Sequence, residues 1–484
     1  MIEIQVAGAG AGKTFGMAKK IIERFDPKSH KDIVAITYTN AAAANIADEL
    51  IKQFGFLPEN IKVCTVHTFL LNEIIYPYSP AILGQIYNTS TRCSLSFGKQ
   101  KARDKPLTEI ERKAEEAKQR AIIISNLKKI QVIHVDEVFA VARQIVDPDH
   151  SKNKTKIKKA KVNRVLGFLN SSIDKIFLDE TQDLNSIALK AFKAIGENAV
   201  DIYMVGDPKQ AIKYPGKFQE LLDENDNNNK ITKLKPNNTS RRVPQKILDL
   251  SNQFCPLDQE QISLSDIEGQ LSYIVSSDDG YDDFIVYHIG KKSLVSIYQK
   301  SGDYSTRSTD TMPDIHPDVN ELLVKHNLDI DKDLVLGAAS HWLAANITQH
   351  PQHQVISKFR KAFNIPHSLK TYAQLCDTVR RHDPSLTNTA KYHISSIDRT
   401  KGLESDVCVL VLTQAIYKYL VKDKLKPVDV YNRTWNMVYV ALTRSRSELV
   451  IAIDKALFTD DPSADDIVTG IEALGFERLD LRKS

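Results

Sequence analysis

Cysteine is scarce in this sequence, and its scarcity excludes two classes of protein. The chain has only 5 cysteines among 484 residues, and they lie far apart. No pair has the short spacing of zinc ligands, and an odd, scattered set does not build the disulfide framework of a small secreted domain. We therefore expect a reduced, cytoplasmic protein.

Long hydrophobic runs and an excess of one charge are also missing. No apolar stretch is long enough to cross a bilayer, and the N-terminus lacks the pattern of a secretory signal. Lys and Arg number 65 against 61 Asp and Glu, which gives a formal net charge of +4. We expect no membrane partner, and the overall charge identifies no other one.

The composition is that of a chain with packed cores, since 42% of the residues are hydrophobic. One region, residues 99–175, is rich in basic residues. Such a run is typical of a solvated helix face or loop, and the alternative is contact with a nucleic-acid backbone. The densest part of the run contains Lys152, Lys154, Lys156, Lys158, Lys159, Lys161 and Arg164.

Short β-rich runs alternate with helical patterns, which predicts α/β architecture with parallel sheets in two lobes. Strands are expected at residues 2–6, 33–37, 176–178, 202–205, 334–336, 393–397, 407–412 and 449–453. Helices are expected at 40–54, 185–195, 341–347 and 435–443. We assign the first lobe to 1–75 and 163–234 and the second to 235–365 and 391–484. A helical, basic insertion is expected at 76–162 and a short one at 366–390.

The start of the chain carries a phosphate-binding pattern. The sequence Ala7-Gly8-Ala9-Gly10-Ala11-Gly12-Lys13-Thr14 follows an apolar run and precedes a helical segment. Glycines in such a loop let backbone N–H groups close around an anion. The expected cradle consists of Ala9, Gly10, Ala11 and Gly12, with Lys13 on the β- and γ-phosphates and Thr14 on Mg²⁺. The sequence therefore predicts a site for a nucleoside triphosphate.

Two further motifs follow predicted strands of the same lobe. Asp179 and Glu180 come directly after residues 176–178, and Gln210 ends the segment 206–210. Beside a P-loop, Asp179 is suited to hold Mg²⁺, and Glu180 to orient or deprotonate the attacking water. Gln210 is neutral and can report the presence of a γ-phosphate.

The ordered set of motifs resembles superfamily 1 helicases of the UvrD/Rep type, in a compact form. The resemblance spans nearly the whole chain, and the helicase component of Gabija-type defence systems is similar in its trimmed form. It rests on residues 7–14, 37–43, 65–69, 179–183, 206–210, 240–244, 400–404 and 440–446.

This resemblance implies two RecA-like lobes with ATP and Mg²⁺ bound between them. Arg242 and Arg444 would reach the γ-phosphate from the second lobe, with Arg444 as the arginine finger. Arg241 is the alternative motif arginine, and it stands where the family has an adenine-stacking tyrosine. Glu404 would lie near the ribose.

For nucleic acid, the resemblance implies that Tyr38 stacks on a base, which suits a motor because stacking tolerates any sequence. Thr39, Asn40, Thr65 and His67 are small polar groups that can contact phosphates. His67 is equally well read as a structural histidine.

A second stacking aromatic is expected after Gln210, where Tyr214 and then Phe218 follow in the sequence. The segment between Gln210 and Phe218 is shorter than in the family, so its register stays open.

The chain also departs from the family pattern. Asp398 replaces a histidine before the KGLE motif, and the upstream glutamine that reads adenine is expected to be missing. The insertions are expected to be small, and in relatives these carry duplex contacts.

Two functions follow from these motifs. The first is a translocase or helicase on single-stranded or tailed duplex DNA with 3′→5′ polarity. The alternative is a nucleotide-sensing subunit of a nuclease complex, in phage defence or in recombination and repair, which unwinds weakly alone. RNA ranks below DNA as the track, because nothing in the sequence reads a 2′-hydroxyl.

Overall fold

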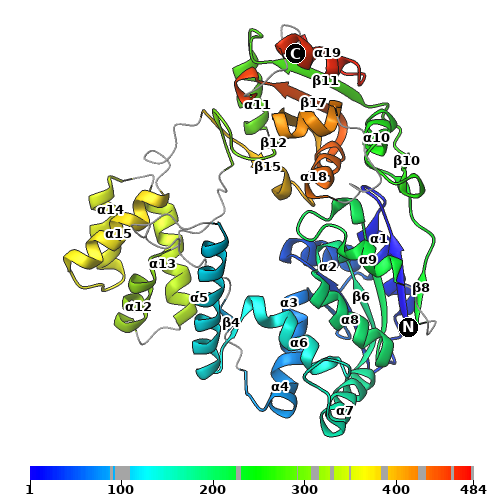
Figure 1. The fold of residues 1–484 in the computed structure, drawn as a ribbon, viewed down its shortest axis with the longest axis vertical. Coiled ribbons are helices and arrows are strands. Elements are labelled where there is room, and N and C mark those ends of the chain that lie inside the picture. Colours follow the sequence, from blue (N-terminus) through cyan, green and yellow to red (C-terminus); the bar gives the residue numbers. More distant parts are fainter. Residues whose placement is uncertain are drawn as a thin grey trace.

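The computed structural model describes most of the chain, and Figure 1 shows its arrangement. The described residues are 1–87, 91–92, 109–224, 230–291, 293–306, 315–327, 332–347, 350–382, 391–422, 432–458 and 463–480. They form two sheets flanked by helices and a separate group of helices, drawn at the left of Figure 1. None of the helices in these ranges is both long and apolar enough to span a bilayer.

The first lobe is built on a six-stranded sheet in the order β3-β2-β6-β7-β1-β8, in which every pair of neighbours is parallel. Its strands are β1 (Ile2–Val6), β2 (Asp32–Thr37), β3 (Ile61–Thr65), β6 (Ile173–Leu178), β7 (Asp201–Gly206) and β8 (Ile231–Lys233). The main helices on it are α1 (Lys13–Arg24), α2 (Asn40–Phe54), α8 (Ser186–Asn198) and α9 (Lys217–Asp223). Parallel strands bring the loops after β1, β6 and β7 to one edge, which is where the predicted motifs lie.

The segment between β3 and β6 is mainly helical, as its composition predicts. It contains α3 (Val66–Phe69), η1 (Leu70–Ile75), α4 (Tyr76–Leu83), β4 (Thr91–Arg92), α5 (Glu109–Lys129), β5 (Ile133–His134), α6 (Val138–Val146) and α7 (Lys156–Ser172). Buried residues of α6 and α7 share one apolar core with β1, β6 and α8. The boundary assigned between residues 162 and 163 falls inside α7, so this part of the segment packs with the first lobe rather than apart from it.

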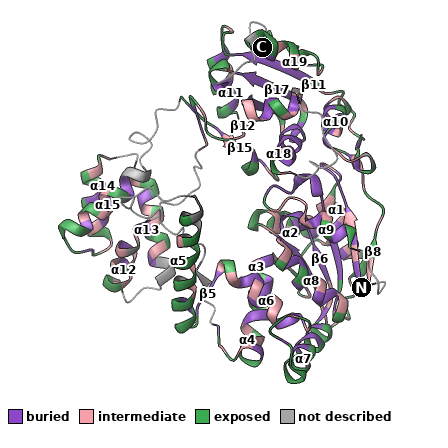
Figure 2. Ribbon diagram, in the orientation of Figure 1, coloured by how far each residue is buried: buried purple, intermediate pink, exposed green. Residues whose placement is uncertain are grey.

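The lysine-rich run lies in and before α7. Val162, Val165, Leu166 and Leu169 are buried on one side of this helix, at the spacing of a single helical face. Most of the lysines are exposed on the other side, and Lys159 pairs with Asp149 at 2.8 Å. The run is thus the solvated face of an amphipathic helix (Figure 2).

The second lobe repeats the plan with a parallel six-stranded sheet in the order β15-β12-β16-β17-β11-β18. Its strands are β11 (Gln270–Val275), β12 (Leu294–Ile297), β15 (Ser395–Ser396), β16 (Ser405–Leu412), β17 (Ser445–Ile453) and β18 (Glu477–Arg478). Its helices are α10 (Gln245–Asn252), α11 (Tyr281–Gly290), α17 (Gln414–Tyr417), α18 (Arg433–Leu442) and α19 (Ala464–Glu472). The predicted α/β fold of two RecA-like lobes is confirmed.

One predicted strand of the second lobe is wrong. Residues 334–336 lie inside α13 (Lys332–Asn346), where Val335, Ala339 and Leu343 are buried at intervals of one helical turn. A short apolar run fits either element, and here the residues that follow it continue a helical period.

Within the described ranges, four helices form a group that lies outside both sheets and is larger than the expected 366–390 insertion. Its members are α12 (Pro317–His326), α13, α14 (Gln352–Ala362) and α15 (Leu369–His382), and they share an apolar core of their own. The group enters through β13 (Tyr304–Ser305) and leaves toward β14 (Tyr392–His393), which pair in parallel, with the Tyr304 and Tyr392 rings stacked at 4.9 Å. Residues 383–390 of the expected insertion lie outside the described ranges.

Candidate functional site

The phosphate-binding loop has the predicted strand, loop and helix context. It runs from the end of β1 to the first residue of α1, and Gly10 and Gly12 adopt left-handed φ values of 69° and 71°. A Cβ at Gly12 would meet no atom within 4 Å, so backbone conformation rather than space requires glycine there. The Lys13 ammonium lies 3.3 Å from Gly8 O, over the N-terminus of α1, where helix N–H groups favour an anion.

Asp179 and Thr14 form a pair at the carboxyl end of β6. The Thr14 hydroxyl donates to Asp179 Oδ2 at 3.3 Å, and the Asp179 side chain is buried. Burial, together with the neighbouring Glu180 carboxylate, raises the pKa of Asp179 to about 7. A hydroxyl and a carboxylate are hard oxygen donors, so these two residues fit Mg²⁺ held mainly through water and phosphate oxygens.

Glu180 stands in a conformation that L-residues rarely adopt, with φ 52° and ψ 38°. Its N–H donates to Asp179 Oδ1 at 2.8 Å, and the Gln182 amide donates to its carboxylate. Burial opposes ionisation, but Lys13 and Lys401, together with the Gln182 hydrogen bond and the Arg444 charge, outweigh it and lower the pKa of Glu180. The carboxylate is therefore ionised and can accept a proton, and strained backbone of this kind gathers at functional sites.

Arg444 reaches this site from the second lobe. Its Nη2 donates to Gln210 Oε1 at 3.1 Å, while its Nε donates to Val440 O at 3.1 Å. Burial, reinforced by the nearby Arg242 charge, lowers the pKa of Arg444 to about 10, so it stays charged at neutral pH. The Gln210 amide donates in turn to Asp207 Oδ2 at 2.8 Å. The structure thus joins two predicted catalytic residues across the lobes.

Arg242, the other predicted arginine, is engaged within its own lobe. Its guanidinium donates to Glu404 at 2.9 Å and to Thr443 O at 3.0 Å. Its Cβ lies against the loop, 2.8 Å from where a Cβ on Gly10 would sit. The Arg241 side chain is exposed, and only its backbone N–H contacts the loop, at 3.0 Å from Gly10 O. Arg242 is therefore near the phosphate loop with its charge already paired to Glu404.

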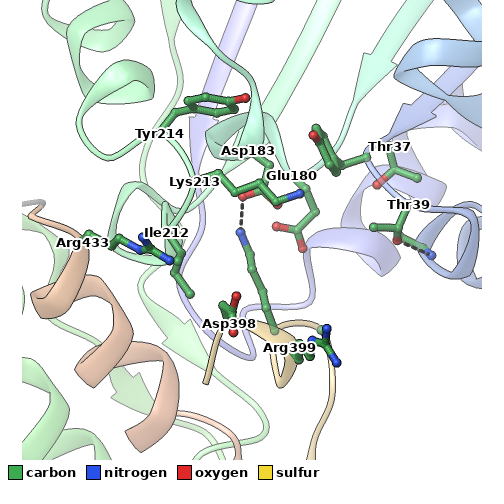
Figure 3. Close-up of a pocket in the computed structure, with 14 residues that line it drawn as sticks. Thr37, Thr39, Glu180, Asp183, Ile212, Lys213, Tyr214, Asp398, Arg399 and Arg433 are labelled. Atoms are coloured by element: carbon green, nitrogen blue, oxygen red, sulfur yellow. Dashed lines mark hydrogen bonds and ion pairs between the residues drawn. The ribbon is translucent and has the colours of Figure 1, made fainter. Parts of the chain in front are cut away.

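A cavity of about 590 Å³ lies between the lobes, beside Glu180 (Figure 3). Four basic and three acidic side chains line it, so its lining is slightly basic. From the first lobe it is lined by Thr37, Tyr38, Thr39, Ala42, Glu180, Asp183, Ile212, Lys213 and Tyr214, and from the second by Asp398, Arg399, Lys401, Gly402 and Arg433.

Three predicted nucleic-acid residues line this cavity, namely Tyr38, Thr39 and Tyr214. The Lys213 ammonium lies 4.1 Å from the centre of the Tyr38 ring, a cation–π contact. Thr39 caps α2 by accepting from Ala42 N at 3.1 Å. Both residues line the cavity, so the N-terminus of α2 lies beside it. A half-buried aromatic ring, a cation and a helix N-terminus are groups that can hold a base and its phosphate.

The other predicted contacts lie outside the cavity lining. Asn40 is exposed at the first turn of α2, and Thr65 caps α3 by accepting from Thr68 N at 3.3 Å. His67 packs between Phe139, at 4.8 Å, and Tyr38, at 6.3 Å. Burial and then the Lys213 charge lower the pKa of His67. These contacts favour the structural interpretation of His67.

Phe218 does not supply a second stacking aromatic. Its side chain is fully buried in the core of the first lobe because α9 turns that face toward α8. Tyr214, earlier in the same segment, is half-buried and lines the cavity.

Sequence reasoning missed several residues that the cavity brings together. The Lys401 ammonium crosses the lobes to Asp183 at 2.5 Å and to Gln210 O at 2.9 Å. Lys401 lies inside the 400–404 motif, Arg399 directly precedes it and Lys213 adjoins Tyr214, so their place in or beside a motif was the available signal. Arg433 at the start of α18 had no such signal.

Comparison with known proteins found similarities in sequence and in structure. Residues 2–215 match a family model described as an AAA domain. The chain is 23% identical to Gabija protein GajB from Bacillus cereus (strain VD045), over 94% of this chain and 93% of that protein. It also aligns with a solved complex of arterivirus nonstructural protein 10, a helicase, with DNA. That alignment has a TM-score of 0.36 and 11% identity, and it covers 97% of this chain and 63% of the other.

The resemblance to UvrD-like superfamily 1 helicases, and to the helicase component of Gabija systems, is confirmed. The matches support a helicase-type ATPase with a nucleotide site in the first lobe.

Proposed function

We propose that this chain is an ATP-dependent translocase or helicase that moves 3′→5′ on single-stranded or tailed duplex DNA. The observation that carries the proposal is the hydrogen bond between Gln210 and Arg444, which joins a first-lobe motif to a second-lobe arginine at 3.1 Å. A γ-phosphate bound beside Gln210 would contact both lobes, so its loss on hydrolysis changes what holds them together. The polarity comes from the resemblance alone.

ATP would bind with its phosphates at the N-terminus of α1, neutralised by Lys13. Thr14 and Asp179 would hold Mg²⁺, which neutralises phosphate charge when it is bound. As the resemblance implies, Arg241 and Glu404 would lie near the base and the ribose. Arg241 stands where the family has an adenine-stacking tyrosine, so we expect weak discrimination between nucleotides.

Hydrolysis needs a base and a group that stabilises developing negative charge. Glu180 would take a proton from the water whose oxygen attacks the γ-phosphorus, while the bond from that phosphorus to the ADP oxygen breaks. Arg444 would stabilise the charge on the transferred phosphoryl group. Arg242 would assist once ligand binding draws it from Glu404.

The nucleic-acid strand would pass through the cavity between the lobes. Tyr38 would stack on a base, and Lys213, Arg399 and Arg433 would neutralise backbone phosphates. Glu180 lines the same cavity, and Lys401 reaches both Asp183 and Gln210 O. The proposed DNA path and the proposed ATP site would therefore adjoin each other at Glu180. Coupling between DNA movement and ATP hydrolysis requires such proximity.

The experiment that tests this proposal measures ATP hydrolysis with and without single-stranded DNA, and strand displacement on 3′-tailed, 5′-tailed and blunt duplexes. Lys13→Ala is the control. We expect stimulation by single strands and displacement from the 3′-tailed substrate. An absence of stimulation at every strand length and salt concentration would remove the motor function.

The alternative function is a nucleotide-sensing subunit of a nuclease complex, and the similarity to Gabija protein GajB over nearly the full length of both chains favours it. In this case the chain would hydrolyse ATP but unwind weakly alone. Co-purification with a nuclease from its native source would support it, whereas full unwinding by the isolated monomer would contradict it.

A further inference from the structure

A glutamine outside all of the motifs contacts the phosphate-binding loop. Gln261 follows α10 in the chain, and its side-chain amide pairs with the Ala9 peptide in both directions. Ala9 N donates to Gln261 Oε1 at 3.1 Å, and Gln261 Nε2 donates to Ala9 O at 2.9 Å. The approach is so close that a Cβ on Gly8 would lie 2.3 Å from Gln261 Cδ. A side chain at position 8 would therefore displace the Gln261 amide from its present place.

The same pairing occurs a second time, one step further from the loop. The Asn252 side chain, at the end of α10, accepts from Gln261 N at 2.8 Å and donates to Gln261 O at 2.9 Å. Only a carboxamide offers a donor and an acceptor in the geometry that matches a peptide group. Two successive amide clamps thus tie α10 of the second lobe to the phosphate-binding loop of the first.

Gln261 also lies at one end of a buried chain of hydrogen bonds. The Tyr439 hydroxyl lies 2.5 Å from Gln261 Oε1 and 3.3 Å from Asp207 Oδ2, so it has an acceptor on either side. Asp207 accepts from Gln210, and Gln210 accepts from Arg444. The chain therefore runs from the loop to the arginine through side chains that are at least 97% buried, since their exposed fractions do not exceed 3%.

A buried lysine balances the charge in this network. Lys209 Nζ lies 3.0 Å from Asp207 Oδ1, donates to Gln259 at 3.3 Å and lies 5.3 Å from the centre of the Tyr439 ring. Burial opposes ionisation of Asp207, but Lys209, Lys13 and the Gln210 amide together outweigh it and keep the pKa of that carboxyl below its usual range. The carboxylate is thus a fixed acceptor for both Tyr439 and Gln210.

We propose that Gln261 is a positioning residue that couples the phosphate-binding loop to the arginine finger Arg444. The coupling rests on the proposed function, because it assigns Arg444 to the γ-phosphate. A shift of the Ala9 peptide when phosphate binds would move the Gln261 amide and, through Tyr439 and Asp207, the Gln210–Arg444 pair. Buried polar groups left unpaired are costly, so the network favours one joint arrangement of loop and finger.

The first test is nucleotide affinity of the full chain, measured by calorimetry with Mg²⁺ and the slowly hydrolysed analogue ATPγS. Gln261→Leu keeps most of the side-chain volume but removes both hydrogen bonds to Ala9, and we expect about tenfold weaker binding. The matched control is Gln245→Leu, an exposed glutamine at the start of α10 that should bind within twofold of the wild type. Unchanged affinity of folded Gln261→Leu would overturn the proposal.

The second test is a double-mutant cycle, which a merely structural role would not affect. Arg444→Ala should weaken ATPγS binding. In the Arg444→Ala background, Gln261→Leu should weaken that binding by less than a further threefold. Equal losses in the two backgrounds would overturn the coupling. Tyr439→Phe removes only the hydroxyl and keeps the ring, so it completes the same cycle if Gln261→Leu does not fold.

The two proposals can fail separately. If single-stranded DNA does not stimulate hydrolysis while the cycle is non-additive, the motor function is wrong and the coupling stands. If DNA stimulates hydrolysis and the cycle is additive, only the coupling is wrong.

Discussion

The interface between the lobes has two sides that differ in how they are filled. On the P-loop side, buried hydrogen bonds join the two lobes. Ala9 pairs with Gln261, which also accepts from Tyr439, and Gln210 accepts from Arg444. On the cavity side, a space of about 590 Å³ remains, and the ion pair of Lys401 with Asp183 crosses it. The first side is filled by buried polar contacts, whereas the second contains a cavity.

This difference matches what the proposed function requires of each side. Charge stabilisation during phosphoryl transfer is strongest where donors are fixed in a dry site. A track that moves past the protein instead needs contacts that form and break without sequence preference. Substitutions should therefore have large effects on the P-loop side and graded effects on the cavity side.

The largest effect is expected from the residues that we propose neutralise the phosphates and activate the attacking water. Lys13→Ala removes the phosphate-neutralising charge, and Glu180→Gln removes the proton acceptor but keeps the shape. Each should lower kcat for ATP by about a thousandfold or more, because both act on the reacting group. The measurement is steady-state hydrolysis, with circular dichroism to show that the fold is intact. Residual turnover above a tenth of the wild type would contradict the assignment.

Within the P-loop side, Arg444 and Arg242 are expected to differ in how much each contributes to ATP hydrolysis. Arg444→Ala should lower kcat by about a thousandfold, the effect of losing an arginine finger. Arg242→Ala should cost no more than about a hundredfold, because its guanidinium is shared with Glu404 and Thr443 O. Hydrolysis rates of the two purified variants at saturating ATP test this order. A larger loss for Arg242→Ala would reverse the roles of the two residues.

A smaller effect is expected on the cavity side. Tyr38→Ala should weaken binding of single-stranded DNA by about 1–3 kcal/mol, the range for one stacked base. Hydrolysis without DNA should stay within twofold, since Tyr38 lines the cavity rather than the proposed phosphate site. Fluorescence anisotropy with a labelled oligonucleotide, together with basal and stimulated rates, separates these effects. Tyr78→Ala, whose ring stacks on Phe168 elsewhere in the lobe, is the matched control. Equal losses of basal and DNA-stimulated hydrolysis would contradict a contact between Tyr38 and DNA.

The smallest effect is expected from His67, whose ring packs edge to face against Tyr38. Its pKa lies below the ordinary value in the folded chain, because burial and Lys213 disfavour its charged form. The unfolded chain therefore binds the proton more readily, and this histidine lowers stability as the pH falls through about 6.5. Thermal unfolding between pH 5.5 and 7.5 should show a smaller acid-dependent drop for His67→Phe than for the wild type. An identical drop in both proteins would show that His67 does not titrate on unfolding.

Much of the fold and of the site follows from local sequence. The order of the P-loop, the acidic pair and the 440–446 motif indicated a two-lobed α/β protein with ATP between the lobes, and the fold is confirmed. These signals are readable because strand ends, glycine turns and helix starts impose their own residue types over a few positions. The strand expected at 334–336 was wrong because a run of three apolar residues is too short to show whether its period is that of a helix or of a strand.

The tertiary structure alone decided which side chains meet across the lobes. Gln261 lies in no motif, yet it pairs with Ala9, which is 252 positions away in the chain. Arg242 was expected at the phosphate and is paired with Glu404, and α12–α15 gather into a helical group that no local pattern had delimited. A hydrogen bond between distant residues depends on how two packed cores are placed against each other, and that placement is a property of the whole chain rather than of any short segment.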